Sequence, residues 1–161
     1  MPERKIYQRN KYVFSQSSLK QLATLHPDLQ RILKVTLMLG IMDFSVREGT
    51  RSDARQEALK KAGKSKVGAG GSMHNTSPSL AVDVAPYFVN RSPTWHDFMR
   101  LAGIIQSVAV MLGTPVRWGG DWDQDGEALT DQDFDDGYHF ELTLVRKASD
   151  LPFVPVTINI Q

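Results

Sequence analysis

The sequence predicts an α+β domain with a small, largely antiparallel sheet and flanking helices. Two observations support this fold class. Segments with the apolar spacing of amphipathic helices are mixed along the chain with several short segments that alternate like strands. No internal repeat and no linker divides the chain. Such a mixture favours a single α+β domain.

The chain has 161 residues, which is enough to bury a core without disulfides, and we expect one domain over 1–161. A polar arm occupies about 1–14, the core about 15–146, and a tail 147–161. The net charge of +1 argues against a general attraction to nucleic acid. We find neither the apolar run of a secretory signal nor the roughly twenty apolar residues of a membrane span. We therefore expect a protein of the cytoplasm, without nucleic-acid partners or stable membrane insertion. We also expect a monomer.

Two helices are predicted near the N-terminus. Ser17 or Ser18 caps the first, which His26-Pro27 interrupts. The second starts at Pro27 and stops at Gly40. The residues that fall on the core-facing side are Leu19, Leu22 and Leu25 in the first helix and Leu29, Ile32, Leu33, Thr36 and Leu37 in the second.

The middle of the chain predicts a strand, a helix and a loop. The strand covers 43–46, and Ser52 caps a helix over 53–62 that ends at Gly63. The glycine- and lysine-rich segment 63–71 is predicted to be a mobile surface loop. Its Lys64 and Lys66 are solvated by default, with contact to an anionic polymer as the alternative.

The second half predicts three strands, one long helix and an edge strand in the tail. In the strand over 81–85, alternation places Asp83 on the face opposite Val82 and Val84. Further strands are expected over 116–118, 140–145 and 153–160. Thr94 caps the long helix, which ends at Gly113 and has an apolar face of Trp95, Phe98, Met99, Ala102, Ile105, Ala109 and Leu112.

Two of the four histidines have an acidic residue nearby, on or beside a strand. With no cysteine in the chain, a metal must be held by His, Asp or Glu. His74, Asp83 and His139 can supply three zinc ligands and leave the fourth position to water, as in catalytic zinc sites. Asp136 suits the base that takes a proton from that water. From spacing alone, an ordinary structural role for these common residue types stays open.

The stretch 118–142 contains further candidates. Asp121, Asp123 and Asp125 alternate, with glycine at the sixth position, like the start of an EF-hand calcium loop. The twelfth position is Gln132 rather than glutamate, so a solvated acidic loop is an equal alternative. The aromatic residues of this stretch, Trp118, Trp122 and Tyr138, are candidates for substrate contact, and a buried aromatic pair is the alternative for the two tryptophans.

Taken together, these motifs resemble a known family. Their order is Arg51 with Gln56, Ser72-x-His74 with Ala81-x-Asp83, Trp118-Gly-Gly-Asp-Trp122, and Asp136-x-x-His139-x-Glu141-Leu142. It is similar to the zinc peptidases that cut peptidoglycan stem peptides. This family includes D-alanyl-D-alanine carboxypeptidases and dipeptidases, and the L-alanyl-D-glutamate endopeptidases that tailed phages use as endolysins. The resemblance runs from about 17 to 144, and the late block is the most specific part.

The resemblance implies roles for individual residues and a hedgehog/DD-peptidase-like fold. His74, Asp83 and His139 correspond to the zinc ligands and Asp136 to the general base. Arg51 corresponds to the arginine that faces the scissile carbonyl. The residues implied to contact substrate are Gln56, Ser72, Trp118 and Tyr138. Some phage endolysins of this family are similar in binding calcium near the acidic loop, which makes calcium a candidate regulator beside zinc.

One departure from the family pattern lies between the first two ligands. The family writes SxHxxGxAxD, whereas here NTSPSLAV separates His74 from Asp83, which is two residues longer and lacks the glycine. The insertion is even in length, so strand alternation is kept. We therefore expect both residues to remain ligands.

The expected function is that of a phage endolysin, a zinc-dependent hydrolase that cleaves the L-alanyl-D-glutamate bond of the stem peptide. Such an enzyme accumulates in the host cytoplasm and reaches the wall or periplasm after a holin opens the membrane. The alternatives are a D-alanyl-D-alanine carboxypeptidase or dipeptidase and, from another class, a non-catalytic metal-dependent cell-wall-binding module. A base beside the zinc ligands speaks against the binding module.

Overall fold

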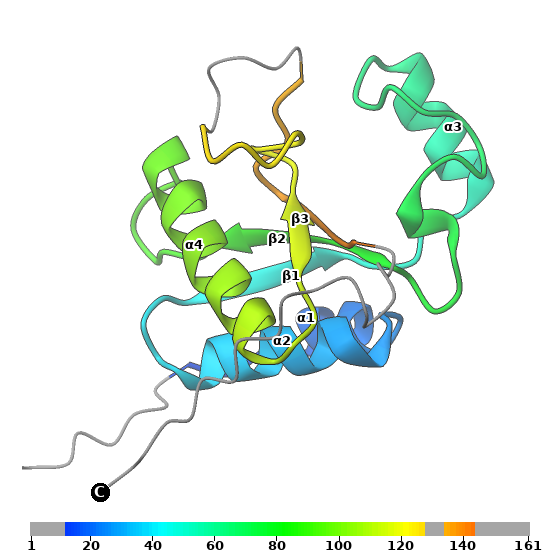
Figure 1. Cartoon of the computed structure of the whole chain (residues 1–161). Coiled ribbons are helices and arrows are strands. Elements are labelled where there is room, and N and C mark those ends of the chain that lie inside the picture. The colour runs from blue at the N-terminus through cyan, green and yellow to red at the C-terminus, as the bar shows by residue number, and fades with distance from the viewer. Residues whose placement is uncertain (1–11, 128–133, 144–161) are drawn as a thin grey trace, which may run out of the picture.

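The computed structural model describes residues 12–127 and 134–143, and these residues form helices packed on one antiparallel sheet (Figure 1). The strand order is β1-β2-β4-β3, and each neighbouring pair is antiparallel. The elements are α1 (Gln16–Leu22), α2 (Pro27–Met38), β1 (Phe44–Glu48), α3 (Asp53–Lys61), the short 3₁₀ helix η1 (Met73–Asn75), β2 (Ala81–Pro86), α4 (Trp95–Met111), β3 (Val116–Trp118) and β4 (His139–Leu142). The predicted α+β class is confirmed.

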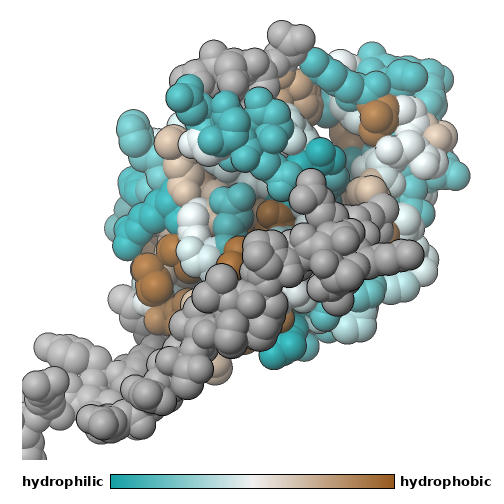
Figure 2. Space-filling model, viewed as in Figure 1, coloured by the Kyte–Doolittle hydropathy of each residue, from teal (hydrophilic) through white to brown (hydrophobic). Residues whose placement is uncertain are grey.

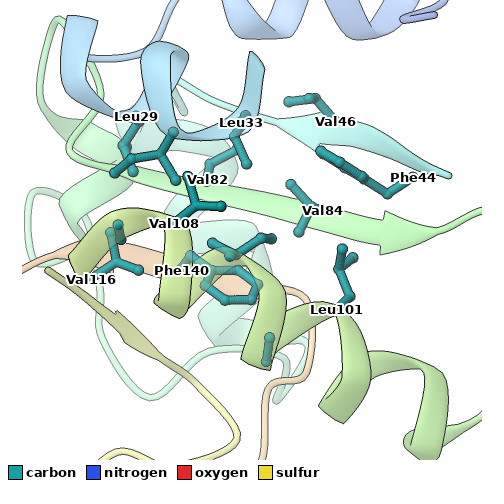
Figure 3. Close-up of a cluster of buried hydrophobic side chains, with 14 of the residues drawn as sticks. Leu29, Leu33, Phe44, Val46, Val82, Val84, Leu101, Val108, Val116 and Phe140 are labelled. Carbon is teal, nitrogen blue, oxygen red and sulfur yellow. The ribbon is translucent and has the colours of Figure 1, made fainter. Parts of the chain in front are cut away.

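The hydrophobic core lies between the sheet and the helices. α4 packs against α2, β2 and β3, and α1 packs against β1. Figure 3 shows the buried side chains of α2, α4 and all four strands meeting in one cluster. Its labelled members are Leu29, Leu33, Phe44, Val46, Val82, Val84, Leu101, Val108, Val116 and Phe140.

Strand alternation gives the sheet a polar face opposite this core. In β2, Val82 and Val84 belong to the core, while Asp83 between them points to the other face. β4 repeats the pattern, since Phe140 and Leu142 are core residues and His139 and Glu141 alternate with them. The register pairs Asp83 with His139, so that the two polar side chains are direct cross-strand neighbours.

A bulge in β1 brings a further carboxylate to the polar face. Val46 pairs with Val84, but the next register pair joins Glu48 to Asp83, so β1 has one extra residue at this point. Simple alternation from Phe44 and Val46 would have turned Glu48 toward the core. The bulge reverses its direction, which places Glu48 beside Asp83.

The starts of the first two helices follow ordinary capping rules, although one predicted cap is wrong. The N-cap of α1 is Ser15, whose Oγ accepts a hydrogen bond from the backbone N–H of Ser18. Ser18 is buried instead, and its Oγ accepts from the N–H of Val46 in β1. α2 begins at Pro27 as predicted, because proline suits the first helical position, where no N–H is needed.

Two residues of the predicted apolar face of α4 lie largely outside the core. Trp95 and Met99 are 43% and 42% exposed, whereas the buried face begins at Phe98 and continues with Leu101 and Ala102. Likewise Leu19 of α1 is 42% exposed, and Leu25 is buried but lies beyond the end of α1. The periodic pattern therefore assigns to the core some apolar residues that remain partly exposed on these helices.

The predicted strand over 140–145 is observed over His139–Leu142, and residues 144–145 lie outside the described part of the chain. The same applies to the predicted edge strand over 153–160 and to most of the polar arm. Among the described residues, no helix is long and apolar enough to cross a membrane. Figure 2 shows a mostly hydrophilic upper part on one face of the molecule and small hydrophobic patches toward the lower left.

Candidate metal centre and active-site cleft

Three ligand atoms converge on the polar face of the sheet. Nε2 of His74 lies 3.1 Å from Oδ1 of Asp83 and 3.2 Å from Nδ1 of His139. The third separation, from Nδ1 of His139 to Oδ1 of Asp83, is 3.4 Å. His74 is fully buried and His139 is nearly so. These residues come from η1, β2 and β4, so the fold joins positions that are far apart in the chain.

The separations of these atoms fit a single zinc ion. Zinc–nitrogen and zinc–oxygen bonds of about 2.0–2.1 Å in a tetrahedron place neighbouring ligand atoms about 3.3–3.4 Å apart. The three observed separations lie close to that value. Two imidazoles and one carboxylate also match the donor set of catalytic zinc sites. The three residues therefore form a candidate metal site that leaves one tetrahedral position open.

Both histidines are held by their second ring nitrogen. Nδ1 of His74 lies 2.7 Å from the carbonyl oxygen of Gly49, which can only accept. The proton of a neutral His74 must therefore be on Nδ1, which leaves the Nε2 lone pair for a metal. Nε2 of His139 lies 2.9 Å from Oε2 of Glu141, and this carboxylate orients the ring in the same way. Such outer contacts are typical of metal-ligating histidines.

The longer segment between His74 and Asp83 is accommodated outside the site. Ser72 accepts a hydrogen bond from the N–H of His74 and caps η1, which fixes the start of the segment. The N–H of Ser79 donates to the carbonyl of Thr24, and Ser79 forms a bridge with Leu25 at the junction of α1 and α2. The extra residues therefore pack toward the helices, and Asp83 keeps its face of the sheet.

Asp136 lies in the turn before β4, beside the three candidate ligands. Burial raises its pKa, and the nearby charge of Asp83 raises it further. Its backbone is fixed because its N–H donates to the carbonyl of Gly119 at 2.8 Å, and Gly119 in turn donates to the carbonyl of His139 at 2.9 Å. A Cβ on Gly119 would lie 2.5 Å from the carbonyl oxygen of Asp136. The glycine thus permits the close approach that places the Asp136 carboxyl at the site.

Arg51 is bound on three sides. Its Nη2 donates to Oδ2 of Asp83 at 3.0 Å and to Oε2 of Glu48 at 2.6 Å. Its Nη1 donates to Oε1 of Gln56 at 2.9 Å. Glu48 also forms an ion pair with Arg55. Although burial favours the neutral acid, the hydrogen bonds from both arginines lower the pKa of Glu48. The guanidinium is therefore held against the second oxygen of a candidate metal ligand.

Arg51, Asp83, Asp136 and His139 line a cleft of about 640 Å³, and the fully buried His74 lies directly behind them. In Figure 1, α3 with its following loop and the segment after β3 both lie above the sheet, and side chains from the two line the cleft. Of the candidate residues named from the sequence, those that line it include Arg51, Lys64, Lys66, Ser72, Asp83, Asp136, Tyr138 and His139. Tyr138 is 44% exposed there and packs against Phe98. Trp122 also lines the cleft.

The expected direct contact of Gln56 and Trp118 with substrate does not agree with their placement. Gln56 is fully buried behind Arg51, and its Nε2 donates to Oγ of Ser65 and to the carbonyl of Val67. Trp118 is 3% exposed and donates from Nε1 to the carbonyl of Gly137. Both residues support the cleft from behind rather than line it.

The loop over 63–71 is fastened to α3, in contrast to the mobile surface loop that its composition predicts. Besides the hydrogen bonds from Gln56, the N–H of Ala69 donates to Glu57 and the N–H of Gly70 donates to Asp53. The fastened loop forms one wall of the cleft.

The acidic loop after β3 brings its three aspartates together. Carboxylate oxygens of Asp121, Asp123 and Asp125 lie within 4.8 Å of one another. Burial raises the pKa of Asp121, and so does a hydrogen bond that its protonated carboxyl donates to Asp123. The positions of the predicted calcium loop from Asp131 to Asp133 lie outside the described residues.

Three charged residues of the site were not assigned a role from the sequence. Glu141 contacts His139, Arg117 pairs with Glu141, and Glu48 holds Arg51. Alternation along β4 places Glu141 on the same face as His139, so that spacing alone could have indicated it. By the same argument, alternation along β3 places Arg117 on this face of the sheet. The position of Glu48 depends on the bulge, which has no comparable signal.

A buried His-Asp-His group with a carboxyl beside it, at the floor of a cleft, is an arrangement typical of hydrolytic metalloenzymes. Comparison with known proteins shows which family within this class of enzymes the chain belongs to. Residues 10–143 match the family model of the phage L-alanyl-D-glutamate peptidases. The chain belongs to this family, which is a family of peptidases that act on the bacterial cell wall.

Two relatives agree with the family match. The L-alanyl-D-glutamate peptidase of Escherichia phage T5 is 32% identical over 127 residues, which cover 72% of this chain and 85% of the relative. The crystal structure of the Serratia marcescens L-Ala D-Glu endopeptidase ChiX is similar with a TM-score of 0.65 and 32% identity. That likeness covers 81% of this chain and 90% of the other.

Proposed function

We propose that this protein is a zinc-dependent endopeptidase that cleaves the L-alanyl-D-glutamate bond of peptidoglycan stem peptides. The observation that carries the proposal is the convergence of Nε2 of His74, Oδ1 of Asp83 and Nδ1 of His139 at separations of 3.1–3.4 Å. The bond itself is proposed from the family and from both relatives, which are named for it.

His74, Asp83 and His139 would hold the zinc ion. When bound, zinc polarises a carbonyl group and lowers the pKa of a water molecule toward about 7. Asp136 is proposed to accept the proton of the attacking water and to pass it to the leaving amine. Its raised pKa in the metal-free site reflects burial and the Asp83 charge. A carboxyl whose pKa moves toward neutrality is suited to both steps.

Arg51 is proposed to stabilise the negative charge that develops on the scissile carbonyl oxygen. The guanidinium lines the cleft next to Asp83, and Glu48 and Gln56 fix its plane. A donor that is already oriented needs no reorganisation when the charge appears. Ser72 and Tyr138 line the same cleft and are proposed to contact the peptide.

We propose that the protein serves as a phage endolysin and functions as a monomer. The enzyme would be made in the host cytoplasm and would reach the wall after a holin or a similar protein permeabilises the membrane. The family name and the phage T5 relative support this role.

Calcium is proposed as a second ion, at the acidic loop. Oδ1 of Asp121 is buried and has no hydrogen-bond partner among the described residues, while Asp123 and Asp125 contribute oxygens nearby. A divalent cation would neutralise these carboxylates and thereby influence the position of Asp136, which follows the loop in the sequence. Calorimetry with calcium alone tests this proposal, and the absence of binding at millimolar concentration would remove it.

The central experiment is mass spectrometry of purified stem peptides after incubation with the zinc-loaded protein, with Asp136→Asn as the control. New ends between L-alanine and D-glutamate, absent in the control, are expected. Release of D-alanine or of its dipeptide would instead identify a D-alanyl-D-alanine carboxypeptidase or dipeptidase. Absence of cleavage with zinc and calcium present would favour a metal-dependent binding module.

A further inference from the structure

We propose that Lys64 and Lys66 form a carboxylate-binding wall of the cleft, which recognises the free carboxylate of the D-glutamate residue next to the cleaved bond. This inference rests on the proposed function and adds a specificity determinant to it. Both lysines lie in the loop after α3, and both line the cleft.

Lys66 reaches the opposite wall of the cleft. Nζ of Lys66 lies 5.5 Å from the centre of the Phe134 ring, in the segment that leads to Asp136 and Tyr138. A cation over an aromatic face at an exposed site is only weakly held. The ammonium group is therefore available to a stronger, anionic partner that enters between the two walls.

Among the described residues, these two lysines have no carboxylate partner, unlike the arginines in the cleft. Arg51 is paired with Glu48 and Asp83, and Arg117 is paired with Glu141. Within residues 12–127 and 134–143, neither lysine forms an ion pair with a carboxylate. The described part of the cleft thus combines arginines that are paired with carboxylates and lysines that form no ion pair.

The fold holds this wall in a fixed relation to Arg51. Oε1 of Gln56 accepts a hydrogen bond from Arg51, and its Nε2 donates to Oγ of Ser65 and to the carbonyl of Val67. Ser65 lies between the two lysines in the sequence, and Val67 follows Lys66. One fully buried amide therefore links the guanidinium to the lysine-bearing loop. Binding of the D-glutamate carboxylate to the lysines would therefore hold the peptide in a fixed position relative to Arg51.

The chemistry of the substrate supplies the anion. D-glutamate has two carboxyl groups, and a peptide chain continues through only one of them. The residue on the amine side of an L-alanyl-D-glutamate bond therefore keeps one free carboxylate, close to the reacting atoms. Ammonium groups bind carboxylates through charge-assisted hydrogen bonds, which are stronger than bonds between neutral groups.

Two synthetic stem peptides test the inference, one with the free D-glutamate carboxylate and one with that group as a carboxamide. Zinc-loaded wild-type protein is expected to cleave the carboxylate peptide with a kcat/KM about tenfold or more above that of the carboxamide, mainly through KM. The double variant Lys64→Gln/Lys66→Gln should lose about tenfold on the carboxylate peptide and stay within about twofold of wild type on the carboxamide. Lys61→Gln is the matched control, because Lys61 is exposed on α3 but does not line the cleft.

The outcomes separate this inference from the proposed function. Equal cleavage of the two peptides by the wild type, or an equal loss on both in the double variant, would overturn the carboxylate-binding wall while leaving the peptidase activity established. Cleavage of neither peptide by the wild type would refute the proposed function, and the wall with it. If Lys61→Gln lost as much kcat/KM on the carboxylate peptide as the double variant, the effect would come from the overall charge of the protein, and the inference would also be overturned.

Discussion

Asp83 of β2 and His139 of β4 are direct register partners, and Oδ1 of Asp83 lies 3.4 Å from Nδ1 of His139. Cross-strand neighbours are set by the hydrogen-bond ladder, so the two candidate ligands are placed by the sheet itself. Only His74 must be brought in from outside the sheet, through η1. The site therefore depends on backbone pairing more than on loop conformation.

The stability of the metal-free protein should depend on pH through this pair. Burial acts against the charged ring, but the hydrogen bonds and charges of Asp83 and Glu141 outweigh it and raise the pKa of His139 to about 9. An unfolded histidine has a pKa of about 6.5. The stabilisation is thus complete below about pH 6.5 and is lost as the pH rises through about 9. Asp83 has the opposite sign: its pKa is depressed, so its contribution is lost as the solution becomes acidic.

Thermal unfolding of the chelator-treated protein between pH 4 and pH 10 checks this expectation. We expect a falling Tm above about pH 7, and a smaller fall in Asp83→Asn, which lacks the charge partner. Zinc should reverse the trend, because the metal displaces the proton from His139 and binds better as the pH rises. A Tm of the metal-free protein that stays level up to pH 10 would contradict the assigned pKa.

Glu141→Gln should weaken metal binding although Glu141 is not proposed as a ligand. Its carboxylate accepts the hydrogen bond from Nε2 of His139, and Arg117 holds its other oxygen. Loss of such an outer partner typically lowers metal affinity by about 10–100-fold. Competition with a chelator of known zinc affinity measures the change. Arg117→Gln should produce a smaller loss, and an unchanged affinity in Glu141→Gln would mean that the carboxylate does not orient the ring.

Asp136→Asn and His139→Ala should both be inactive but should differ in metal content. Asp136 is proposed as the base, whose removal costs on the order of 10²–10⁴ in rate without removing a ligand. His139→Ala removes a ligand and should be depleted in zinc. Zinc analysis of the two purified variants beside the wild type makes the comparison. Equal depletion in both would show that Asp136 binds the metal.

Much of the fold could be predicted from local patterns. Alternation in β2 and β4 places Asp83 and His139 on the face away from the core, and the even length of the insertion after His74 keeps that face. The α+β class and the starts of α2 and α3 followed from apolar spacing and from capping residues. Residue types and spacing offered this ligand set as one of several interpretations, and the resemblance to a known family selected it.

The rest could not be predicted because it depends on tertiary contacts. The β1 bulge that turns Glu48 toward Arg51 has no sequence pattern of its own. Gln56 and Trp118 occur in motifs that suggested direct substrate contact, yet packing places both behind the cleft. The glycine-rich loop looks mobile by composition, and only the position of Gln56 shows how it is fastened.

Gly119→Ala should lower activity while zinc stays bound. The new Cβ would lie 2.5 Å from the carbonyl oxygen of Asp136, 3.1 Å from its Cβ and 2.9 Å from the Trp122 ring. Because the Asp136 backbone is held at this point by two hydrogen bonds to the β3–β4 region, the proposed base must shift. A displacement of the order of 1 Å typically costs about a hundredfold in rate, and a smaller shift about tenfold.

Gly103→Ala is the matched control, since nothing lies within 4 Å of a Cβ at this position in α4. It should leave kcat unchanged and stabilise the protein by about 0.5–1 kcal/mol, because alanine is favoured over glycine inside a helix. Steady-state kinetics, zinc content and Tm of both variants test the pair. Full activity in Gly119→Ala would show that the position of Asp136 does not depend on this close approach.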